Sequence, residues 1–487
     1  MDKDLKKLQP AALWSHFAEI CNIPRPSHHE EKIREYVINF AKTHHLDYTV
    51  DEGPNVIIRK PATPGMENRR TIVLQAHLDM VPQKNSDKEF DFEKDPIEAY
   101  IDGEWVTANG TTLGADNGIG ASTILAVLES KELKHGPIEA LFTATEETGM
   151  DGAFALKPGE LKGDILLNLD SETEGELYVG CAGGLDLTAT MKYDTEKIDK
   201  KEFAGYRLEL KGLKGGHSGM EIILQRGNAN KLLARFLRNY QEKLGIMLCD
   251  IDGGGLRNAI PREAFATVAV MKKNEKAFLN AVKKFEKLYI AEYKGIEDSL
   301  SFRAVPATLP AKAINFFDQA NLVDAVYACP NGVVRMSTAM PGLVQTSSNL
   351  SRVVSERGSF KIQCLLRSSM NSEKEDLALT MRTVFELTGA TVKTSGSYDG
   401  WNPNMDSPIL KTMMVGYEKL YGTKPAVMAI HAGLECGIIG GKYPSMDMIS
   451  FGPTIKYPHS PDEKVNIASV EKFWKFLCYT LETAPTK

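Results

Sequence analysis

Several acidic residues and a histidine directly follow apolar runs that are typical of strands. His77 and Asp79 come after TIVLQA, and because successive side chains of a strand alternate between its faces, these two share a face. Such a carboxylate can fix the orientation of a metal-binding imidazole. The rest of the set is Asp116 in GTTLGADNGIG, Glu146 and Glu147 after IEALFTAT, and Asp170 after DILLNL. Carboxylates crowded at one sheet edge repel one another unless cations lie between them, so the set indicates a metal site.

The donor types favour zinc. Histidine with several carboxylates and no cysteine suits Zn²⁺, with Co²⁺ or Mn²⁺ as substitutes. Five ligands that include one shared carboxylate fit a two-metal hydrolytic site, in which the ions lie roughly 3.5–4 Å apart. A second histidine is then needed, and His459 in FGPTIKYPHSPDE is the best candidate. The sequence therefore predicts two zinc ions per subunit.

An alternation of strands and helices must position these side chains. The pattern predicts a helix over 117–130 and strands over 55–60, 71–76, 138–145 and 164–169. An earlier helix is predicted after Ser27, which forms a capping-box pattern with Glu30. This order is typical of an α/β domain with a mostly parallel mixed sheet. Ligands in such sheets bind beyond the carboxyl ends of the strands, where the acidic set follows.

The texture of the chain changes near residue 186. Amphipathic strands there mix with long charged helices such as 275–291, which favours an α+β arrangement, as one unit or as two tandem units of similar design. After GSYDGW the strand–helix style of the first part returns. We predict a catalytic domain whose first part is 1–185 and second part 398–487, split by an inserted domain over 186–397.

Composition excludes several classes of partner. The 487 residues carry a net charge of −6 with the two signs interspersed, so no basic stripe for nucleic acid is present. The sequence contains no run of 18 apolar residues free of charge, so it predicts no membrane span. The seven cysteines are scattered singly and the start, MDKDLKKLQPAALW, lacks a secretory apolar run, so we expect a reducing, cytoplasmic location.

Five short motifs stand in a fixed order: HLDMVP, GADNG, EETG, LDSE and PHSPDE. Their order resembles the M20 family of zinc aminoacylases and peptidases and, within it, the bacterial aminoacyl-histidine dipeptidases, over the whole chain. The resemblance implies a zinc-peptidase-type catalytic domain, a lid and dimerisation role for the insert, and a homodimer formed through it.

The resemblance also implies a role for each ligand. Asp116 would bridge both metals, His77 and Asp170 would complete one site, and Glu147 and His459 the other.

Three further residues would act beside these ligands. Asp79 would orient His77, and Glu146 would be the general base and then the acid that protonates the leaving amine. His217, in KGGHSGM of the insert, would stabilise the tetrahedral oxyanion in the active site of the other subunit. The family pattern also suggests a cis peptide between Asp116 and Asn117.

Substrate contacts are expected at positions that resemble the family's binding residues. Asn258 in RNAIPRE and Arg367 at the end of IQCLLRSS would bind polar groups or a carboxylate, for which the arginine fork is well suited. The segment HAGLECG, with His431, Gly433 and Glu435, would form a substrate-binding loop.

The preferred hypothesis is therefore a two-zinc metallodipeptidase that cleaves unblocked dipeptides, Xaa-His and broader. An N-acyl amino acid deacylase would use the same metals and base but would need no counter-charge for a substrate amine. A non-catalytic zinc-binding scaffold is a third hypothesis. The intact Glu146 disfavours it, because a scaffold needs ligands but no base.

Overall fold

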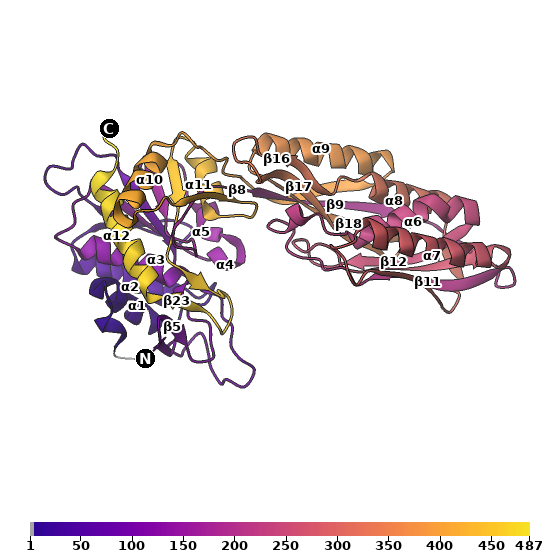
Figure 1. Ribbon diagram of the computed structural model, residues 1–487, viewed down its shortest axis with the longest axis horizontal. Coiled ribbons are helices and arrows are strands. Elements are labelled where there is room, and N and C mark those ends of the chain that lie inside the picture. The colour runs from indigo at the N-terminus through magenta and orange to yellow at the C-terminus, as the bar shows by residue number, and fades with distance from the viewer. Residues whose placement is uncertain (1–3) are drawn as a thin grey trace. The chain divides into compact units, whose positions relative to one another are not determined.

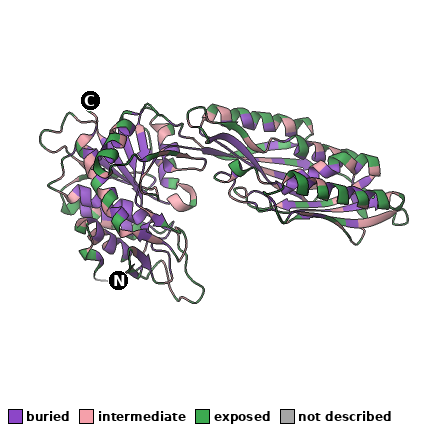
Figure 2. Cartoon of the chain, in the orientation of Figure 1, coloured by how far each residue is buried: buried purple, intermediate pink, exposed green. Residues whose placement is uncertain are grey.

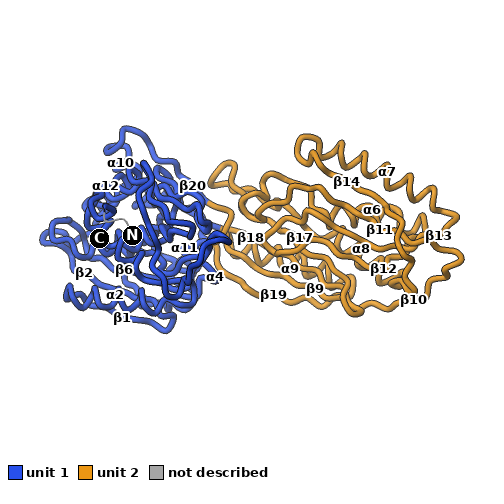
Figure 3. Tube along the Cα trace, turned by 90° about the horizontal axis from the view of Figure 1, so that it is seen from below, with its two compact units in different colours: residues 1–181, 401–429, 434–487 blue, residues 182–400, 430–433 orange. Residues whose placement is uncertain are grey.

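The computed structural model describes residues 4–487, which divide into two compact units (Figure 1, Figure 3). Unit 1 holds the chain up to Cys181, Trp401–Ala429 and Leu434–Lys487, and unit 2 holds Ala182–Gly400 with Ile430–Gly433. The short segment 430–433, which we expected in the catalytic domain, therefore packs within unit 2. His431 contributes to this packing, since its Nε2 lies 2.7 Å from the Ser347 Oγ of that unit.

Unit 1 is built on an eight-stranded mixed sheet. In spatial order its strands are β1 (Asp47–Val50), β2 (Val56–Lys60), β6 (Ile138–Thr143), β3 (Ile72–His77), β7 (Ile165–Asn168), β21 (Asp447–Ser450), β8 (Glu176–Cys181) and β20 (Ala426–Ile430). The adjacent strands β6, β3, β7 and β21 run parallel, and antiparallel pairs flank them. The predicted α/β class with a mixed sheet is thus confirmed.

The central strands of this sheet are buried along their whole length, as β-branched and leucine-rich strands covered on both faces must be. Figure 2 shows this burial. Helices of unit 1 are α1 (Ala11–Cys21), α2 (Glu31–Thr43), α3 (Ala115–Glu129), α4 (Glu146–Gly149), α5 (Asp151–Ala155), α10 (Pro408–Tyr421), α11 (Glu435–Lys442) and α12 (Ile467–Thr483), with the 3-10 turn η1 (Leu5–Lys7). A small second sheet has the order β22 (Ile455–Lys456), β23 (Lys464–Asn466), β5 (Trp105–Ala108) and β4 (Ala99–Asp102).

The predicted capping box before α2 is wrong. The helix begins at Glu31, and its N-terminal cap, Glu30, makes no side-chain capping bond. Ser27 instead donates its Oγ hydrogen to Asp79 Oδ2 at 2.8 Å, and Glu30 accepts from Thr145. A tertiary contact with a buried carboxylate has replaced the local contact that the sequence pattern favours.

Unit 2 is a nine-stranded antiparallel sheet. Its main path is β14 (Ser301–Pro306), β11 (Phe203–Lys211), β13 (Ala264–Met271), β12 (Ile246–Gly254), β17 (Val344–Glu356), β18 (Ser359–Ser368), β9 (Gly183–Lys192) and β19 (Thr391–Tyr398), and β16 (Gly332–Met336) pairs with β17. A separate short pair joins β10 (Thr195–Lys197) to β15 (Lys312–Ile314). The helical segments are α6 (Ala229–Leu244), α7 (Glu275–Glu292), α8 (Phe316–Ala328) and α9 (Asn371–Leu387), with the 3-10 turns η2 (Ile222–Leu224) and η3 (Lys272–Asn274).

Strand residues of unit 2 alternate between core and solvent. On β9, Leu187, Ala189 and Met191 are buried while Thr190 and Lys192 are exposed. The buried face joins apolar residues of the four long helices in one core, so the unit has a helical layer on one face of its sheet. Among residues 4–487, no helix has the length and apolar character needed to cross a membrane.

Candidate active site

The carboxyl ends of the parallel strands bring the acidic set together. β3 ends at His77, and Glu146 and Asp170 follow the ends of its two neighbours β6 and β7. Because these strands run in the same direction, the residues after them meet at one edge of the sheet. The site is therefore a direct consequence of the strand order.

Asp116 lies between the two imidazoles. Its Oδ1 is 3.1 Å from His77 Nε2, and its Oδ2 is 3.2 Å from His459 Nε2. Asp170 Oδ1 lies 3.3 Å from the same His77 nitrogen, and Glu147 Oε2 lies 3.0 Å from that of His459. The five residues form two adjoining groups that share one carboxylate. Ligand atoms within each group lie within 4.8 Å of one another.

Asp79 is a buried carboxylate behind the cluster. Its Oδ1 lies 3.4 Å from His77 Nδ1, on the side of the ring opposite Asp116. It also accepts the backbone N–H of Glu146 at 3.0 Å and of Glu147 at 3.2 Å. The Asp79 carboxylate thus lies beside an imidazole, whose Nδ1 is also 3.1 Å from the Asp79 backbone carbonyl, and it holds the first turn of α4, which carries both glutamates. Ser27, which sequence reasoning missed in this role, completes its contacts.

Charge in the cluster is divided unequally. Burial, and then the nearby Asp170 and Glu435, raise the pKa of Glu146 well above its usual range, although His77 opposes this. Burial also raises the pKa of Asp170 to about 6. Asp116 goes the other way: burial opposes ionisation, but its hydrogen bonds to His459 and His77 lower its pKa. The site therefore contains one carboxylate held ionised and a neighbour that favours its proton.

The imidazoles carry the balancing charge. Hydrogen bonds to Asp116 and Glu147 raise the pKa of His459 to about 11. Burial alone would lower the pKa of His77, but Asp170, Asp116 and Asp79 together raise it well above its usual value. A set of anions that holds protons on both histidines is a set that a divalent cation could neutralise.

Asn117 is a further site residue that the sequence did not single out. Its peptide bond with Asp116 is cis, as the family pattern suggests. The buried Asn117 side chain donates Nδ2–H to Asp170 Oδ1 at 2.5 Å. Gly120, one helical turn along α3, leaves room for it, because a Cβ there would lie 1.9 Å from Asn117 Oδ1.

A second polar cluster lies within unit 2. His217 Nδ1 accepts the backbone N–H groups of Gly219 and Met220 at 3.3 and 3.1 Å, so a neutral ring carries its proton on Nε2. Burial, followed by the charge of Arg367, lowers the pKa of His217. Burial and the same arginine lower that of His431 to about 3. Both histidines are therefore neutral near pH 7.

Arg367 is 6% exposed, and no Asp or Glu within the described chain forms an ion pair with it. Its Nη1 donates to the Tyr398 hydroxyl at 3.2 Å, while Nε is buried without a hydrogen-bond partner. Asp186 interacts electrostatically with Arg367 but forms no ion pair with it, so the buried guanidinium has donors that suit an anionic ligand.

The remaining substrate candidates are divided. Asn258 is exposed, and its carbonyl accepts from Ser218 at 2.8 Å, next to His217. His431 and Gly433 belong to unit 2, whereas Glu435 begins α11 in unit 1. Glu435 is buried and accepts from Gln75 at 2.6 Å and Thr143 at 2.8 Å, and burial raises its pKa to about 8. The segment that was expected to form one binding loop thus belongs partly to unit 2 and partly to unit 1.

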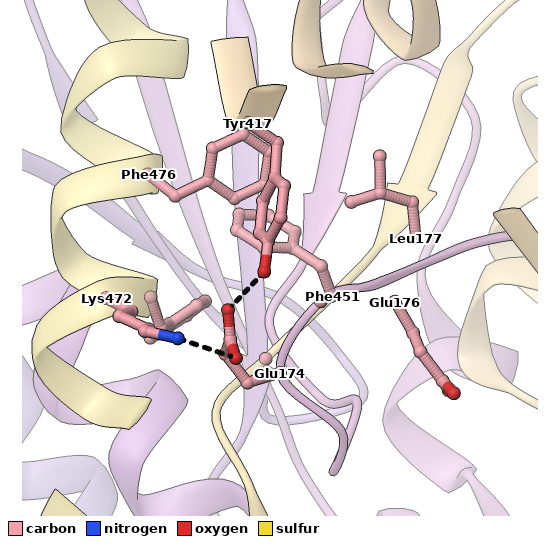
Figure 4. A pocket seen from close by; sticks show the side chains of 10 residues that line it. Glu174, Glu176, Leu177, Tyr417, Phe451, Lys472 and Phe476 are labelled. Carbon is pink, nitrogen blue, oxygen red and sulfur yellow. Dashed lines mark hydrogen bonds and ion pairs between the residues drawn. The ribbon is translucent and has the colours of Figure 1, made fainter. Parts of the chain in front are cut away.

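A small pocket elsewhere in unit 1 does not compete with this site. Figure 4 shows Tyr417 and Lys472 directed at Glu174. The Tyr417 hydroxyl lies 2.5 Å and Lys472 Nζ 3.4 Å from the Glu174 carboxylate, and Phe451 and Phe476 also line the pocket. Its volume of about 10 Å³ holds at most one water molecule. A peptide cannot enter it.

Two relatives match this chain over almost its full length. It is 47% identical over 484 residues to the cytosol non-specific dipeptidase of Escherichia coli, covering 99% of this chain and all of that protein. The aminoacylhistidine dipeptidase of Vibrio alginolyticus superposes with a TM-score of 0.96 at 50% identity, covering 99% of this chain and 98% of that one.

A solved structure of much lower sequence identity shares the fold. The aminopeptidase PepT of Bacillus cereus superposes with a TM-score of 0.62 at 17% identity, over 98% of this chain and 99% of that one, which shows a shared fold alone. The model of peptidase family M20/M25/M40 matches residues 73–483, a range that spans every strand-end residue of the acidic cluster and His459. The chain belongs to peptidase family M20/M25/M40.

Proposed function

We propose that this enzyme is a two-zinc dipeptidase that hydrolyses unblocked dipeptides, Xaa-His among them. The observation that carries the proposal is Asp116, whose two oxygens face two different histidines, each with its own second carboxylate. A single-metal site would need only one of these groups, whereas a shared carboxylate is what a pair of ions requires.

The donors fit zinc. His77 and His459 supply imidazole nitrogens, Asp116, Asp170 and Glu147 supply oxygens, and no cysteine takes part. Glu147 Oε1 is buried without a hydrogen-bond partner, which leaves a second oxygen of that group for a cation. Nitrogen and carboxylate donors suit Zn²⁺, and Co²⁺ or Mn²⁺ could replace it.

Glu146 is the proposed general base. Bound zinc would lower the pKa of water toward 7 and polarise the peptide carbonyl. Glu146 also lies within ligand distance of His77 and Glu147, but the two sets that share Asp116 do not use it. Its pKa is raised, and its carboxylate is proposed to take a proton from the attacking water and give it to the leaving amine. Asp79 would fix the position of Glu146, because its carboxylate accepts the Glu146 backbone N–H at 3.0 Å.

Substrate recognition is proposed to rest on unit 2. Arg367 would bind the free carboxylate, because among residues 4–487 its buried guanidinium forms no ion pair and its Nε has no hydrogen-bond partner. His217 would donate Nε2–H to the developing oxyanion, since its Nδ1 is already occupied by two backbone amides. Asn258, His431 and Gly433 are proposed to shape this part of the binding surface.

A homodimer formed through unit 2 is the proposed assembly. Exposed apolar side chains lie on η2, two residues before it and on the contacting strand β16: Met220, Ile223, Leu224, Val334 and Met336. Exposed apolar groups of this kind are typical of protein interfaces. The name of the E. coli relative supports a cytosolic location and a broad range of dipeptides.

Hydrolysis of a small substrate panel tests the proposal. Ala-His, Gly-Leu, β-Ala-His, a tripeptide and N-acetyl-leucine would be assayed with the protein as purified, after chelation, and after zinc is restored. We expect chelator-sensitive, zinc-restored cleavage of the free dipeptides. Preference for N-acetyl-leucine would make the enzyme a deacylase, and bound zinc without any cleavage would make it a scaffold.

A further inference from the structure

The carboxylate of Glu463 is enclosed by the loop that carries Asp116. Its Oε2 accepts the backbone N–H groups of Leu113 and Gly114 at 2.8 and 2.9 Å. Its Oε1 accepts those of Ala115 and Asp116 at 2.8 and 3.2 Å. Four consecutive amides thus converge on one side chain, and that side chain is 1% exposed.

Arg25 holds the same loop from its carbonyl side. Arg25 is 2% exposed, and its Nη2 donates to the Gly114 carbonyl at 2.5 Å. Its Nη1 donates to the carbonyls of Leu78 and Asp79, both at 2.9 Å. One buried cation therefore joins the bridging loop to the end of β3, where His77 and Asp79 are.

The four backbone N–H groups of the loop need hydrogen-bond acceptors. Converging backbone N–H groups form a concave positive site, and buried amides without acceptors are costly. Gly114 adopts φ +70°, and a Cβ there would lie 2.5 Å from Arg25 Nη2, so the loop and the guanidinium fit closely. A glutamine at 463 would direct its NH₂ group at two of the four amides.

We propose that Glu463 and Arg25 are positioning residues of the metal centre, and that together they aim the two oxygens of Asp116 at His77 and His459. The proposal rests on the two-metal function. Glu463 lies four residues after His459. The segment that supplies one imidazole therefore also holds the backbone of the shared carboxylate. Displacing that loop changes both metal sites at once, whereas the loss of one terminal ligand would change one.

A matched pair of glutamine variants separates positioning from general support. Glu139 is a control in the same unit: it is 3% exposed, and it accepts the backbone N–H groups of Lys162 and Gly163 at 2.7 and 2.9 Å. Glu463→Gln and Glu139→Gln should both lower thermal stability. Only Glu463→Gln should weaken zinc binding, by about 10- to 100-fold in competition with a chromophoric chelator, because outer partners tune metal affinity on this scale.

Two further readouts complete the test. Co²⁺-loaded Glu463→Gln should show an altered visible absorption spectrum and a lower kcat at nearly constant KM, and Glu463→Asp, which keeps the charge, should recover part of the zinc affinity. Zinc affinity and a cobalt spectrum equal to those of the unmodified enzyme would overturn the proposal. If Glu463→Gln does not fold, Glu463→Asp and Arg25→Lys decide by the same criteria. Wild-type protein that binds zinc but cleaves no dipeptide would refute the function while leaving this comparison valid.

Discussion

Glu146 and Glu147 are sequence neighbours, and the proposal assigns them different chemistry. Glu147 lies 3.0 Å from His459, while Glu146 has a pKa raised chiefly by burial. We expect Glu146→Gln to keep its zinc content and to lose about 10²- to 10⁴-fold in kcat, because the amide cannot accept a proton. Glu147→Gln should instead lose zinc. Metal analysis beside steady-state kinetics checks both, and zinc loss from Glu146→Gln would contradict the assignment.

Zinc binding should release protons. In the metal-free site, Asp116 and Glu147 raise the pKa of His459 to about 11, so the ring is charged at pH 7. Zinc binds only the neutral ring, so binding must expel that proton, and zinc affinity should rise with increasing pH. Calorimetric zinc titrations at pH 7 in two buffers of different ionisation enthalpy measure the protons released. Equal heats in the two buffers would show that the site is already deprotonated.

Arg367 should set the affinity for a free carboxylate. Removing hydrogen bonds to a charged group costs about 1.5–3 kcal/mol, so Arg367→Met should raise KM for a dipeptide roughly 10- to 100-fold. The C-terminal amide of the same dipeptide should be affected much less. Arg303→Met, at an exposed position of the same sheet, is the control. An equal loss for acid and amide would place Arg367 in a structural role.

Residue types alone indicated the candidate metal-binding set, because carboxylates and histidines that follow parallel strands gather at one sheet edge, where cations would offset their mutual repulsion. The residues that hold this set in place could not be predicted from the sequence. Arg25 contacts Gly114 and Glu463 contacts Ala115 across long stretches of chain, and neither contact leaves a periodic pattern. Ser27 misled for the same reason, since its partner Asp79 lies 52 residues away.

At the scale of elements, the apolar runs predicted the central strands to within a few residues. TIVLQA became β3 (Ile72–His77), and DILLNL became β7 (Ile165–Asn168). Runs of β-branched and leucine residues suit strands buried on both faces, so their pattern is strong. The order of the strands could not be predicted in the same way. β21, from near the other end of the chain, pairs with β7, and only tertiary packing decides this.

The close approach of α3 to the segment that follows β7 gives an element-scale prediction. A Cβ at Gly120 would lie 1.9 Å from Asn117 Oδ1 and 2.7 Å from the Leu169 carbonyl. Gly120→Ala should therefore lower the free energy of unfolding by about 1–3 kcal/mol, as overpacking does, and should disturb the Asn117 contact with Asp170. Urea denaturation measures the first effect and zinc content the second. Gly255→Ala, where a Cβ meets nothing within 4 Å, is the control. Equal stability of the two variants would contradict the packing argument.

At the scale of the whole molecule, the proposed dimer explains an apolar surface that a monomer would leave in water. Leu224 is 49% exposed and Met220 59%, and both follow His217 closely in sequence. Leu224→Glu should shift the protein toward monomers and lower activity, as light scattering after gel filtration and the dipeptide assay would show. A dimer that persists with full activity would place the interface elsewhere.

Mixing two inactive variants tests whether His217 acts across that dimer. Glu146→Gln lacks the base and His217→Ala lacks the oxyanion donor, so each alone should be nearly inactive. In a mixed dimer, one site would combine an intact Glu146 with the partner's intact histidine. Half of the randomly assembled dimers are mixed and one of their two sites is complete, so activity should recover to about a quarter of wild type. If His217 serves its own subunit, no site becomes complete and no activity returns. Subunit exchange verified by mass spectrometry makes that negative result decisive.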